Sequence, residues 1–368
     1  MNHPLRIVQL IDSLEAGGAE RMAVNYANTL ANATAYSALV TTRKEGALKA
    51  QLSDAVDYLF LNKQGRLGLG AVRKFRHFVK QHKIDVIHAH STSFFTAVLV
   101  KLTYPKVKII WHDHYGNSAF LEQRSSFVLR ALSVFFEGII SVNVSLKEWA
   151  VTHLKFKNVV YLPNFVFFTD ANNSLNETVL HGMSGKRIVC LANLRAQKNH
   201  GMLLEVAALL KETHSDWSFH LVGKDFEDDY SRWLHQEILD CHLTEHVFVY
   251  GSRNDVGAIL HQSDLAVLTS KSEGLPVALL EYGFYKKPVL STNVGEIGTV
   301  IENGVNGVLV TSGDVNAFYS VLVQLIENHA TRTLLAENLF KHIQDYYSED
   351  AVVGQYLEWL SKRIENRE

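Results

Sequence analysis

Short apolar runs alternate with amphipathic stretches along the chain, and this alternation constrains the fold more than any other feature. In the first half the apolar runs lie at residues 6–11, 38–41, 58–61, 85–88, 107–111, 138–142 and 158–162. Helical patterns stand between them, such as Met22, Tyr26 and Leu30, which are spaced by four. Strands that alternate with helices predict a parallel sheet covered by helices on both faces.

The alternation stops after Pro163, in the polar segment 169–178, and then begins again. Apolar runs follow at residues 187–191, 218–222, 247–250, 265–268, 288–291 and 307–310. The last 50 residues are helical in pattern, with Asp314 and Ser348 as expected N-caps. We predict an α/β protein of two doubly wound, Rossmann-like domains, at residues 1–168 and 169–346. We also predict a C-terminal helix at residues 347–368, which could cross back to the first domain.

Ligands of open parallel sheets bind beyond the carboxyl ends of the strands. We therefore expect an active site in a cleft between two facing domains.

Composition excludes several classes of protein. The 368 residues are 47% hydrophobic and 20% charged, which is typical of a globular protein with large cores. The nearest approach to a membrane span, residues 127–140, contains Arg130 and Glu137. The first residues lack the order of a signal peptide, and only Cys190 and Cys241 are present, so we expect a cytoplasmic protein without a disulfide framework.

The net charge of −2 hides an uneven distribution. Residues 1–165 contain 20 Lys and Arg against 11 Asp and Glu, whereas residues 166–368 contain 16 against 27. Opposite charges on two halves suggest two domains with different partners. A chance excess on solvated surfaces is the alternative.

Three segments could carry chemistry. The turn after the first strand contains Gly17 and Gly18 before a helix, where backbone N–H groups could bind an anion, although a plain tight turn has the same sequence. After the strand at 187–191, Arg195 and Lys198 precede a helix and form a candidate diphosphate clamp. A solvated helix start is the alternative for that pair.

The third segment, residues 270–281, is the most informative. Glu273 and Gly274 follow a buried strand, Pro276 opens a helix, and Glu281 lies within its apolar stretch. A carboxylate there is costly to bury unless it accepts hydrogen bonds, which a vicinal diol would donate. A purely structural pair of acids is the alternative.

Together these segments resemble glycosyltransferases of family 4, which are retaining enzymes with the GT-B fold. Glu273 and Glu281 match the Glu-x7-Glu signature of that family. The resemblance extends over nearly the whole chain, through residues 17–21, 85–90, 111–116, 162–164, 221–223 and 288–292.

The resemblance implies transfer of a hexose from a nucleotide sugar, most simply UDP-linked, to a hydroxyl, without a metal or cofactor. Glu281 would hold the ribose, and Glu273 would lie beside the donor sugar. Lys198 and the N–H groups of Gly274 and Leu275 would hold the diphosphate.

Gly17 and Gly18 would face the diphosphate from the first domain. The chain departs from the commoner pattern at Asn193, where an Arg is expected in the donor site. Arg195 could take over that role, or Lys198 could act alone.

Histidines near the fourth and fifth strands complete the candidate site. By position, His114 or His112 would contact the donor sugar, with His114 favoured, while His88, His90 and His112 would lie on the acceptor side. His112 and His114 flank Asp113 and resemble a metal cluster, but tetrahedral zinc sites seldom take ligands this close together, so we expect no metal.

Basic residues of the first half suggest a partner. Arg73, Lys74, Arg76, Lys80 and Lys83 share an amphipathic stretch with Phe75, Phe78 and Val79. This pattern suits an anionic membrane surface, and members of the family often use lipid-linked acceptors. We see no nucleic-acid-binding motif.

The sequence therefore predicts a cytoplasmic, peripherally membrane-associated glycosyltransferase of polysaccharide biosynthesis, acting on lipopolysaccharide or capsule. A nucleotide-sugar epimerase of the same fold is one alternative. A catalytically silent sugar-binding subunit is another.

Overall fold

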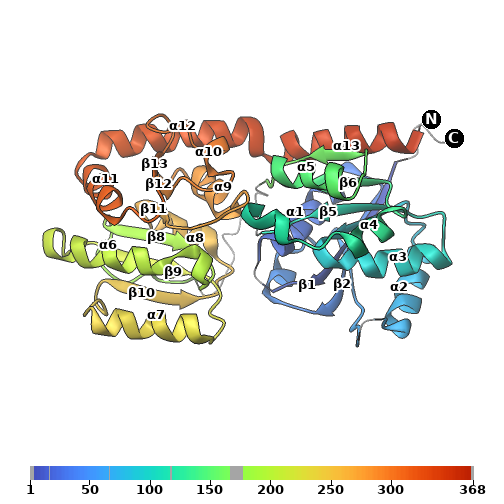
Figure 1. Cartoon of the computed structure of the whole chain (residues 1–368), viewed down its shortest axis with the longest axis horizontal. Helices are drawn as coiled ribbons and strands as arrows, with labels where there is room; N and C mark the ends of the chain where they lie inside the picture. Colours follow the sequence, from blue (N-terminus) through green and yellow to red (C-terminus); the bar gives the residue numbers. More distant parts are fainter. Residues whose placement is uncertain (1–3, 16, 66, 117, 166–176, 366–368) are drawn as a thin grey trace. The chain divides into compact units, whose positions relative to one another are not determined.

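A computed structural model of the chain describes residues 4–15, 17–65, 67–116, 118–165 and 177–365. The chain forms two compact units (Figure 1): unit 1 is Met1–Phe167 with Ser348–Glu368, and unit 2 is Phe168–Tyr347. The last helix therefore belongs to unit 1. The linker predicted at residues 169–178 lies outside the described residues as far as residue 176.

Unit 1 is built on a seven-stranded parallel sheet with the order β3-β2-β1-β4-β5-β6-β7. The strands are β1 (Arg6–Ser13), β2 (Tyr36–Lys44), β3 (Asp57–Phe60), β4 (Val86–His90), β5 (Lys108–Asp113), β6 (Gly138–Ser141) and β7 (Val159–Tyr161). All seven runs predicted in this half form strands, because uninterrupted apolar sequence is what a sheet buried on both faces requires.

Helices cover both faces of this sheet. They are α1 (Gly18–Ala33), α2 (Leu69–Gln81), α3 (Phe94–Thr103), α4 (Phe127–Ser133), α5 (Val144–His153) and α13 (Glu349–Glu365), with short 3-10 helices at Ala47–Gln51, Ser91–Ser93 and Ser118–Gln123. Ile87 packs in a core cluster with α2, α3, α4 and α5, whereas its neighbour Val86 packs in another with α1 and α13. Since successive strand residues point to opposite faces, these two sets of helices cover opposite faces of the sheet.

Unit 2 contains a six-stranded parallel sheet with the order β10-β9-β8-β11-β12-β13. Its strands are β8 (Arg187–Leu191), β9 (Ser218–Val222), β10 (Val247–Gly251), β11 (Leu265–Leu268), β12 (Val289–Thr292) and β13 (Val308–Val310). All six predicted runs again form strands. This confirms the predicted fold class of two Rossmann-like domains.

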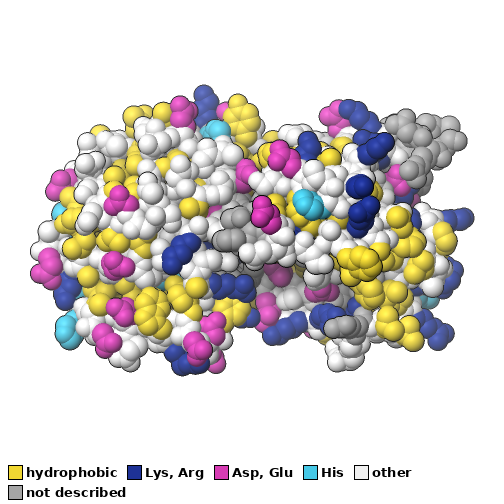
Figure 2. All heavy atoms as spheres, in the orientation of Figure 1, with side chains coloured by type: hydrophobic (Ala, Val, Ile, Leu, Met, Phe, Trp, Pro, Cys, Tyr) yellow, Lys and Arg dark blue, Asp and Glu magenta, His cyan; other side chains and the backbone are white. Residues whose placement is uncertain are grey.

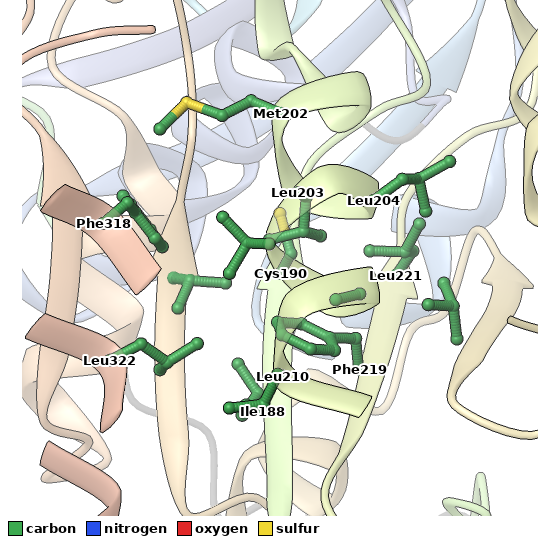
Figure 3. Close-up of a cluster of buried hydrophobic side chains, with 14 of the residues drawn as sticks. Ile188, Cys190, Met202, Leu203, Leu204, Leu210, Phe219, Leu221, Phe318 and Leu322 are labelled. Carbon is green, nitrogen blue, oxygen red and sulfur yellow. The ribbon is translucent and has the colours of Figure 1, made fainter. Parts of the chain in front are cut away.

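The helices of unit 2 are α6 (His200–Thr213), α7 (Asp229–Asp240), α8 (Val256–His261), α9 (Val277–Phe284), α10 (Ile297–Val300), α11 (Val315–Glu327) and α12 (His329–Tyr347), with a 3-10 turn at Ala196–Lys198. On one face Leu203 of α6 and Phe318 of α11 pack onto Ile188 and Phe219 of the sheet (Figure 3). Burial of such side chains stabilises each by about 1.5–3 kcal/mol.

Both predicted N-caps are present. The Asp314 side chain accepts a hydrogen bond from the N–H of Ala317 at the start of α11. The Ser348 hydroxyl accepts one from the N–H of Ala351, 3.3 Å away, at the start of α13. No helix among the described residues is long and apolar enough to cross a bilayer.

Candidate active site

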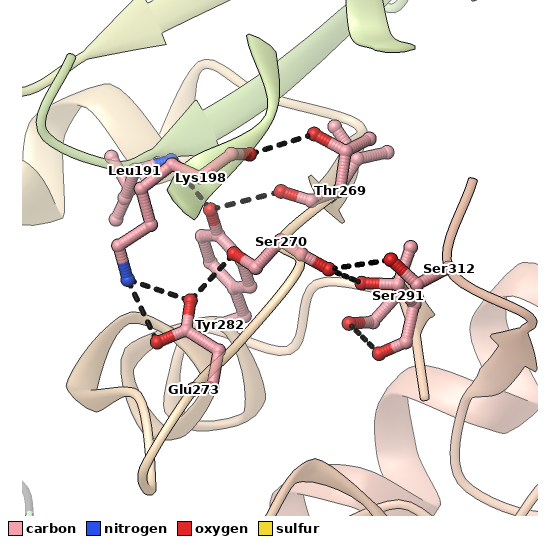
Figure 4. Close-up of polar contacts among 10 residues, drawn as sticks. Leu191, Lys198, Thr269, Ser270, Glu273, Tyr282, Ser291 and Ser312 are labelled. Atoms are coloured by element: carbon pink, nitrogen blue, oxygen red, sulfur yellow. Dashed lines mark hydrogen bonds and ion pairs between the residues drawn. The ribbon is translucent and has the colours of Figure 1, made fainter. Parts of the chain in front are cut away.

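Lys198 and Glu273, two predicted site residues, bind each other in unit 2. The strands β8 and β11 are parallel neighbours, so the loops that follow them leave the same edge of the sheet. Lys198 Nζ lies 2.6 and 2.7 Å from the two carboxylate oxygens of Glu273 (Figure 4). The Glu273 side chain is 5% exposed, so this is a largely buried charge-assisted contact.

Hydroxyl groups fix this pair in place. Ser270 Oγ donates to Glu273 Oε1 at 2.6 Å, while the carbonyl oxygen of Ser270 accepts hydrogen bonds from the hydroxyls of Thr292 and Ser312. These contacts connect the end of β12 and the segment after β13 to the loop that carries Glu273 (Figure 4). Ser270 and Thr292 lie in segments that resemble the family, but no role was predicted for them, and Ser312 was not predicted at all. A hydroxyl that bonds a distant backbone carbonyl, as those of Thr292 and Ser312 do, leaves no local pattern.

A second loop packs against the backbone of Glu273 and Gly274. Gly295 has φ +58°, and a methyl group added there would lie 1.9 Å from the carbonyl oxygen of Glu273. The N–H of Glu296 donates to the carbonyl oxygen of Gly274 at 3.3 Å. Glycine is therefore required at position 295 by both the backbone conformation and the close approach, although no motif in the sequence marks it.

Helix α9 carries Glu281, which is buried to 8% exposure. The adjacent Tyr282 accepts a hydrogen bond on its hydroxyl from the N–H of Leu191, 2.6 Å away at the end of β8. This contact fixes α9 on the sheet. Leu275, in the turn before α9, is 4% exposed. The assignment of Glu281 to a ribose and of Gly274 and Leu275 to a diphosphate stays a prediction.

Asn193, predicted in the donor site, and Arg195, predicted in the clamp, each have a partner in the neighbouring loop, and their donor contacts stay predictions. Asn193 Oδ1 accepts a hydrogen bond from the N–H of Lys224, 2.8 Å away, which joins the loops after β8 and β9. The exposed Arg195 places its guanidinium 4.4 Å from the centre of the Phe226 ring. Among the predicted cations of this loop, the structure therefore brings Lys198 to Glu273 and places Arg195 over an aromatic ring.

The predicted loop of unit 1 leads directly into α1. Gly17 is the N-cap and Gly18 the first residue of the helix. Gly17 has φ −167°, an extended conformation open to any residue, but an added methyl group would lie 2.3 Å from Glu20 Oε2. A carboxylate thus lies over Gly17, and the proposed donor contact of these glycines stays a prediction.

Four histidines at the ends of β4 and β5 form a hydrogen-bonded group. His88 Nε2 lies 3.1 Å from His112 Nδ1, and His90 Nδ1 lies 2.9 Å from His114 Nε2. His88, His90 and His112 are at most 1% exposed, beneath Tyr26 of α1.

Burial lowers the pKa of His114 to about 3 and holds the pKa values of the other three well below the ordinary value, so all four rings are neutral at pH 7. His88, His90 and His112 thus contribute to the core of unit 1. His114, which is partly exposed, is the member of the group best able to meet a ligand.

The potential metal ligands are not those suggested by the sequence. Asp113 forms a two-point ion pair with Arg124, at 2.7 and 2.9 Å, and is therefore already bound. Among the described residues the ligand atoms of His88, His90 and His112 lie within 4.8 Å of one another. Both ring nitrogens of His90 take part in hydrogen bonds, with His114 and Gln9, whereas His88 and His112 use one nitrogen each, for the bond between them. His88 Nδ1 and His112 Nε2 are buried without a hydrogen-bond partner in the structure.

Comparison with known proteins agrees with this architecture. A family model described as Glycosyltransferase Family 4 matches residues 16–167, and one described as Glycosyl transferases group 1 matches residues 176–342. The amylovoran biosynthesis glycosyltransferase AmsD of Erwinia amylovora is 24% identical, over 94% of this chain and 96% of its own. A UDP-Gal:alpha-D-GlcNAc-diphosphoundecaprenol alpha-1,3-galactosyltransferase of Escherichia coli is 24% identical over 87% of both chains.

Solved structures show the same fold. HepE of Anabaena, in complex with UDP and glucose, superposes with a TM-score of 0.78 at 20% identity, over 97% of this chain and 100% of its own. The two family matches fall on the two sheets and together leave only residues 168–175 uncovered between positions 16 and 342. The protein therefore belongs to the glycosyltransferases of family 4 and has their GT-B fold.

Proposed function

We propose that this glycosyltransferase moves a hexose from a UDP-linked donor to a hydroxyl of a lipid-linked cell-surface glycan, with retention of the anomeric configuration. The observation that carries the proposal is the buried Lys198–Glu273 pair at the ends of β8 and β11. One cation and one carboxylate, held side by side, offer a contact for a diphosphate and a contact for sugar hydroxyls.

The relatives support the choice of donor and acceptor. HepE has been crystallised with UDP and glucose. The Escherichia coli relative is named for UDP-Gal and a diphosphoundecaprenol-linked sugar, and AmsD is named for the biosynthesis of amylovoran. By analogy with these relatives, we propose a UDP-linked donor and a lipid-linked glycan acceptor for this chain.

The proposed mechanism needs neither a metal nor a cofactor. As the glycosidic bond breaks, the leaving diphosphate gains negative charge, which Lys198 and the backbone N–H groups at the start of α9 would stabilise more in the transition state than in the ground state. The acceptor hydroxyl would attack on the face that the leaving phosphate vacates, and a phosphate oxygen would take its proton. Glu281 would hold the ribose hydroxyls, while Glu273 and His114 would contact the sugar.

The outer helices of unit 1 suit an anionic membrane surface. Helices α2, α3, α4 and α5, which share one core cluster, carry seven Lys and Arg residues and a single acid, Glu148. Phe75 and Val79, which the sequence analysis placed with these bases, are buried in the core of unit 1, because they form the inner face of α2. The exposed apolar residues instead include Phe127 at 81%, Leu69 at 75%, and Val134, which follows α4, at 76%. Figure 2 shows apolar and basic side chains next to one another over this part of the surface. Exposed apolar residues among bases favour peripheral binding to anionic lipid on the cytosolic side.

A screen of nucleotide sugars by thermal shift tests the donor. A ligand that binds the folded state raises its melting temperature, and UDP-hexoses should give the largest shift. NMR of the product should then show the same anomeric configuration as the donor. An inverted product would refute retention, and a shift by another nucleotide alone would refute the UDP assignment.

A further inference from the structure

The ion pair between Lys198 and Glu273 is built into the backbone of two loops. Thr269 Oγ1 donates to the carbonyl oxygens of Lys198 and Asn199, at 3.2 and 3.1 Å. The N–H of Lys271 donates to the carbonyl oxygen of Gln197 at 2.8 Å. The loops that carry the two charges are thus tied together on either side of the pair, which therefore does not depend on two flexible side chains meeting by chance.

Any anion that binds Lys198 must compete with the Glu273 carboxylate for the ammonium group. Two contacts of the ammonium group, at 2.6 and 2.7 Å, go to the Glu273 carboxylate. A diphosphate that takes over Lys198 removes the cation beside a carboxylate that is only 5% exposed. Loss of the partner of a buried charge is costly, because water cannot replace it.

We infer that Glu273 is an internal counter-ion that competes with the donor diphosphate for Lys198 and so makes the site prefer a nucleotide sugar to a nucleoside diphosphate. This inference rests on the proposed function. A nucleotide sugar brings hydroxyl groups, which can donate to the Glu273 carboxylate as the phosphates take Lys198. A nucleoside diphosphate lacks the donor sugar, so the carboxylate keeps the Ser270 hydroxyl but gains no sugar hydroxyl in exchange for its cation.

The same competition favours release of the product. Once the sugar has moved to the acceptor, no donor hydroxyl remains beside Glu273. The carboxylate then recovers Lys198 and weakens the hold of the site on the diphosphate. Ser270, whose hydroxyl donates to Glu273 Oε1, keeps the carboxylate oriented throughout this exchange.

Calorimetry on the full chain with two probes, UDP and UDP-glucose, tests the inference. Replacing the carboxylate by a neutral amide in Glu273→Gln should tighten UDP binding about tenfold, since the competing charged contact is lost. The affinity for UDP-glucose should rise clearly less, so the ratio of the affinities for UDP-glucose and UDP should fall. Glu205→Gln on the exposed face of α6 removes the same charge and should change UDP affinity by less than about twofold, because exposed charges are screened.

Equal or weaker UDP binding by a folded Glu273→Gln would overturn the inference. Far-UV circular dichroism checks folding, and Glu273→Ala, which also removes the charge, gives the same reading if the amide variant does not fold. ADP and GDP are measured in parallel. If only one of these binds, the UDP assignment fails, while the effect of Glu273→Gln on that nucleotide still tests the counter-ion.

Discussion

The two units share one architecture but differ in how they carry charge. Unit 1, including Ser348–Glu368, has 23 Lys and Arg against 16 Asp and Glu, whereas unit 2 has 13 against 22. In unit 1 most of the excess of basic over acidic residues lies on α2, α3, α4 and α5, the helices that cover one face of the sheet. The acidic unit 2 nevertheless holds Lys198 at the candidate donor site. Binding of an anion can therefore depend on one local cation against the net charge of its domain.

The two units also differ in the polar groups that they bury at the ends of their central strands. Unit 1 buries three neighbouring imidazoles, those of His88, His90 and His112, at the ends of β4 and β5, beside the Asp113–Arg124 ion pair. Unit 2 buries the Lys198–Glu273 ion pair at the ends of β8 and β11, and its buried histidines among the described residues do not form such a group. Neutral rings bonded to one another need no counter-charge, whereas the Lys198–Glu273 pair can be exchanged for ligand contacts. The comparison predicts that acid acts mainly on unit 1 and that charge removal at the site acts on unit 2.

The largest expected effect is a loss of stability of unit 1 in acid. An unfolded histidine binds a proton near pH 6.5, whereas burial lowers the pKa of His114 to about 3 and that of His88, His90 and His112 well below 6.5. Protons then bind the unfolded chain more readily than the folded one. The free energy of unfolding of unit 1 is therefore highest above pH 6.5, and below pH 6.5 each of these histidines lowers it by about 1.4 kcal/mol per pH unit.

Among the described residues unit 2 contains three further histidines with lowered pKa values: His200 at about 4, His220 at about 3, and His342, each lowered mainly by burial. Hydrogen exchange, corrected for its intrinsic pH dependence, should show that β4 and β5 lose more protection between pH 7 and 5.5 than β8 and β11. Equal losses of protection in the two units would refute the prediction that acid destabilises unit 1 more.

Next in size is the effect of Lys198→Ala on turnover. Removal of the cation from the leaving diphosphate should lower kcat/KM about 100- to 1000-fold. Lys286→Ala, on the exposed surface of unit 2 where Lys286 pairs with Glu337, serves as a control with the same change of charge. Similar activity of the two variants would remove Lys198 from the mechanism.

A smaller effect is expected from Glu281→Ala. If the carboxylate holds the ribose hydroxyls, its loss should weaken nucleotide binding by about 1–3 kcal/mol. Calorimetry with UDP measures this directly, with Glu205→Ala on the exposed face of α6 as the control. An unchanged affinity would return Glu281 to a structural role.

Removal of basic residues from the surface of unit 1 should weaken membrane binding by about 1 kcal/mol for each residue near the lipid. Co-sedimentation with vesicles should require anionic lipid and weaken as salt rises. The triple variant Arg73→Gln, Lys74→Gln and Lys80→Gln should bind less. A matched triple change in unit 2, at Lys211, Arg232 and Lys286, should have little effect, and equal losses would show that net charge alone decides binding.

The smallest expected effect is that of chelation. Activity should survive EDTA, because the charge of the leaving diphosphate is balanced by Lys198 and backbone N–H groups in the proposed mechanism. Loss of activity in EDTA with recovery on adding Mn²⁺ would refute the metal-free mechanism.

The elements could be predicted because their signals are local. Every strand arises from a short apolar run, and the caps at Asp314 and Ser348 act on N–H groups three residues away. The site could be predicted only as a set of candidates. Arg195 stays a predicted donor contact. Its guanidinium lies over Phe226 of the loop after β9, a partner that no local sequence pattern indicates.

Local patterns in the chain predict two α/β sheets in series, the Glu-x7-Glu signature marks Glu273 and Glu281, and Lys198 is marked as a cation after a strand. The folded chain is needed to see that Lys198 and Glu273, 75 positions apart, bind each other, and that His88, His90 and His112 are buried. The physical reason is that periodicity and capping act between neighbours in the chain. Ion pairing and burial depend instead on the order in which strands join the sheet, which places β8 beside β11 and β4 beside β5.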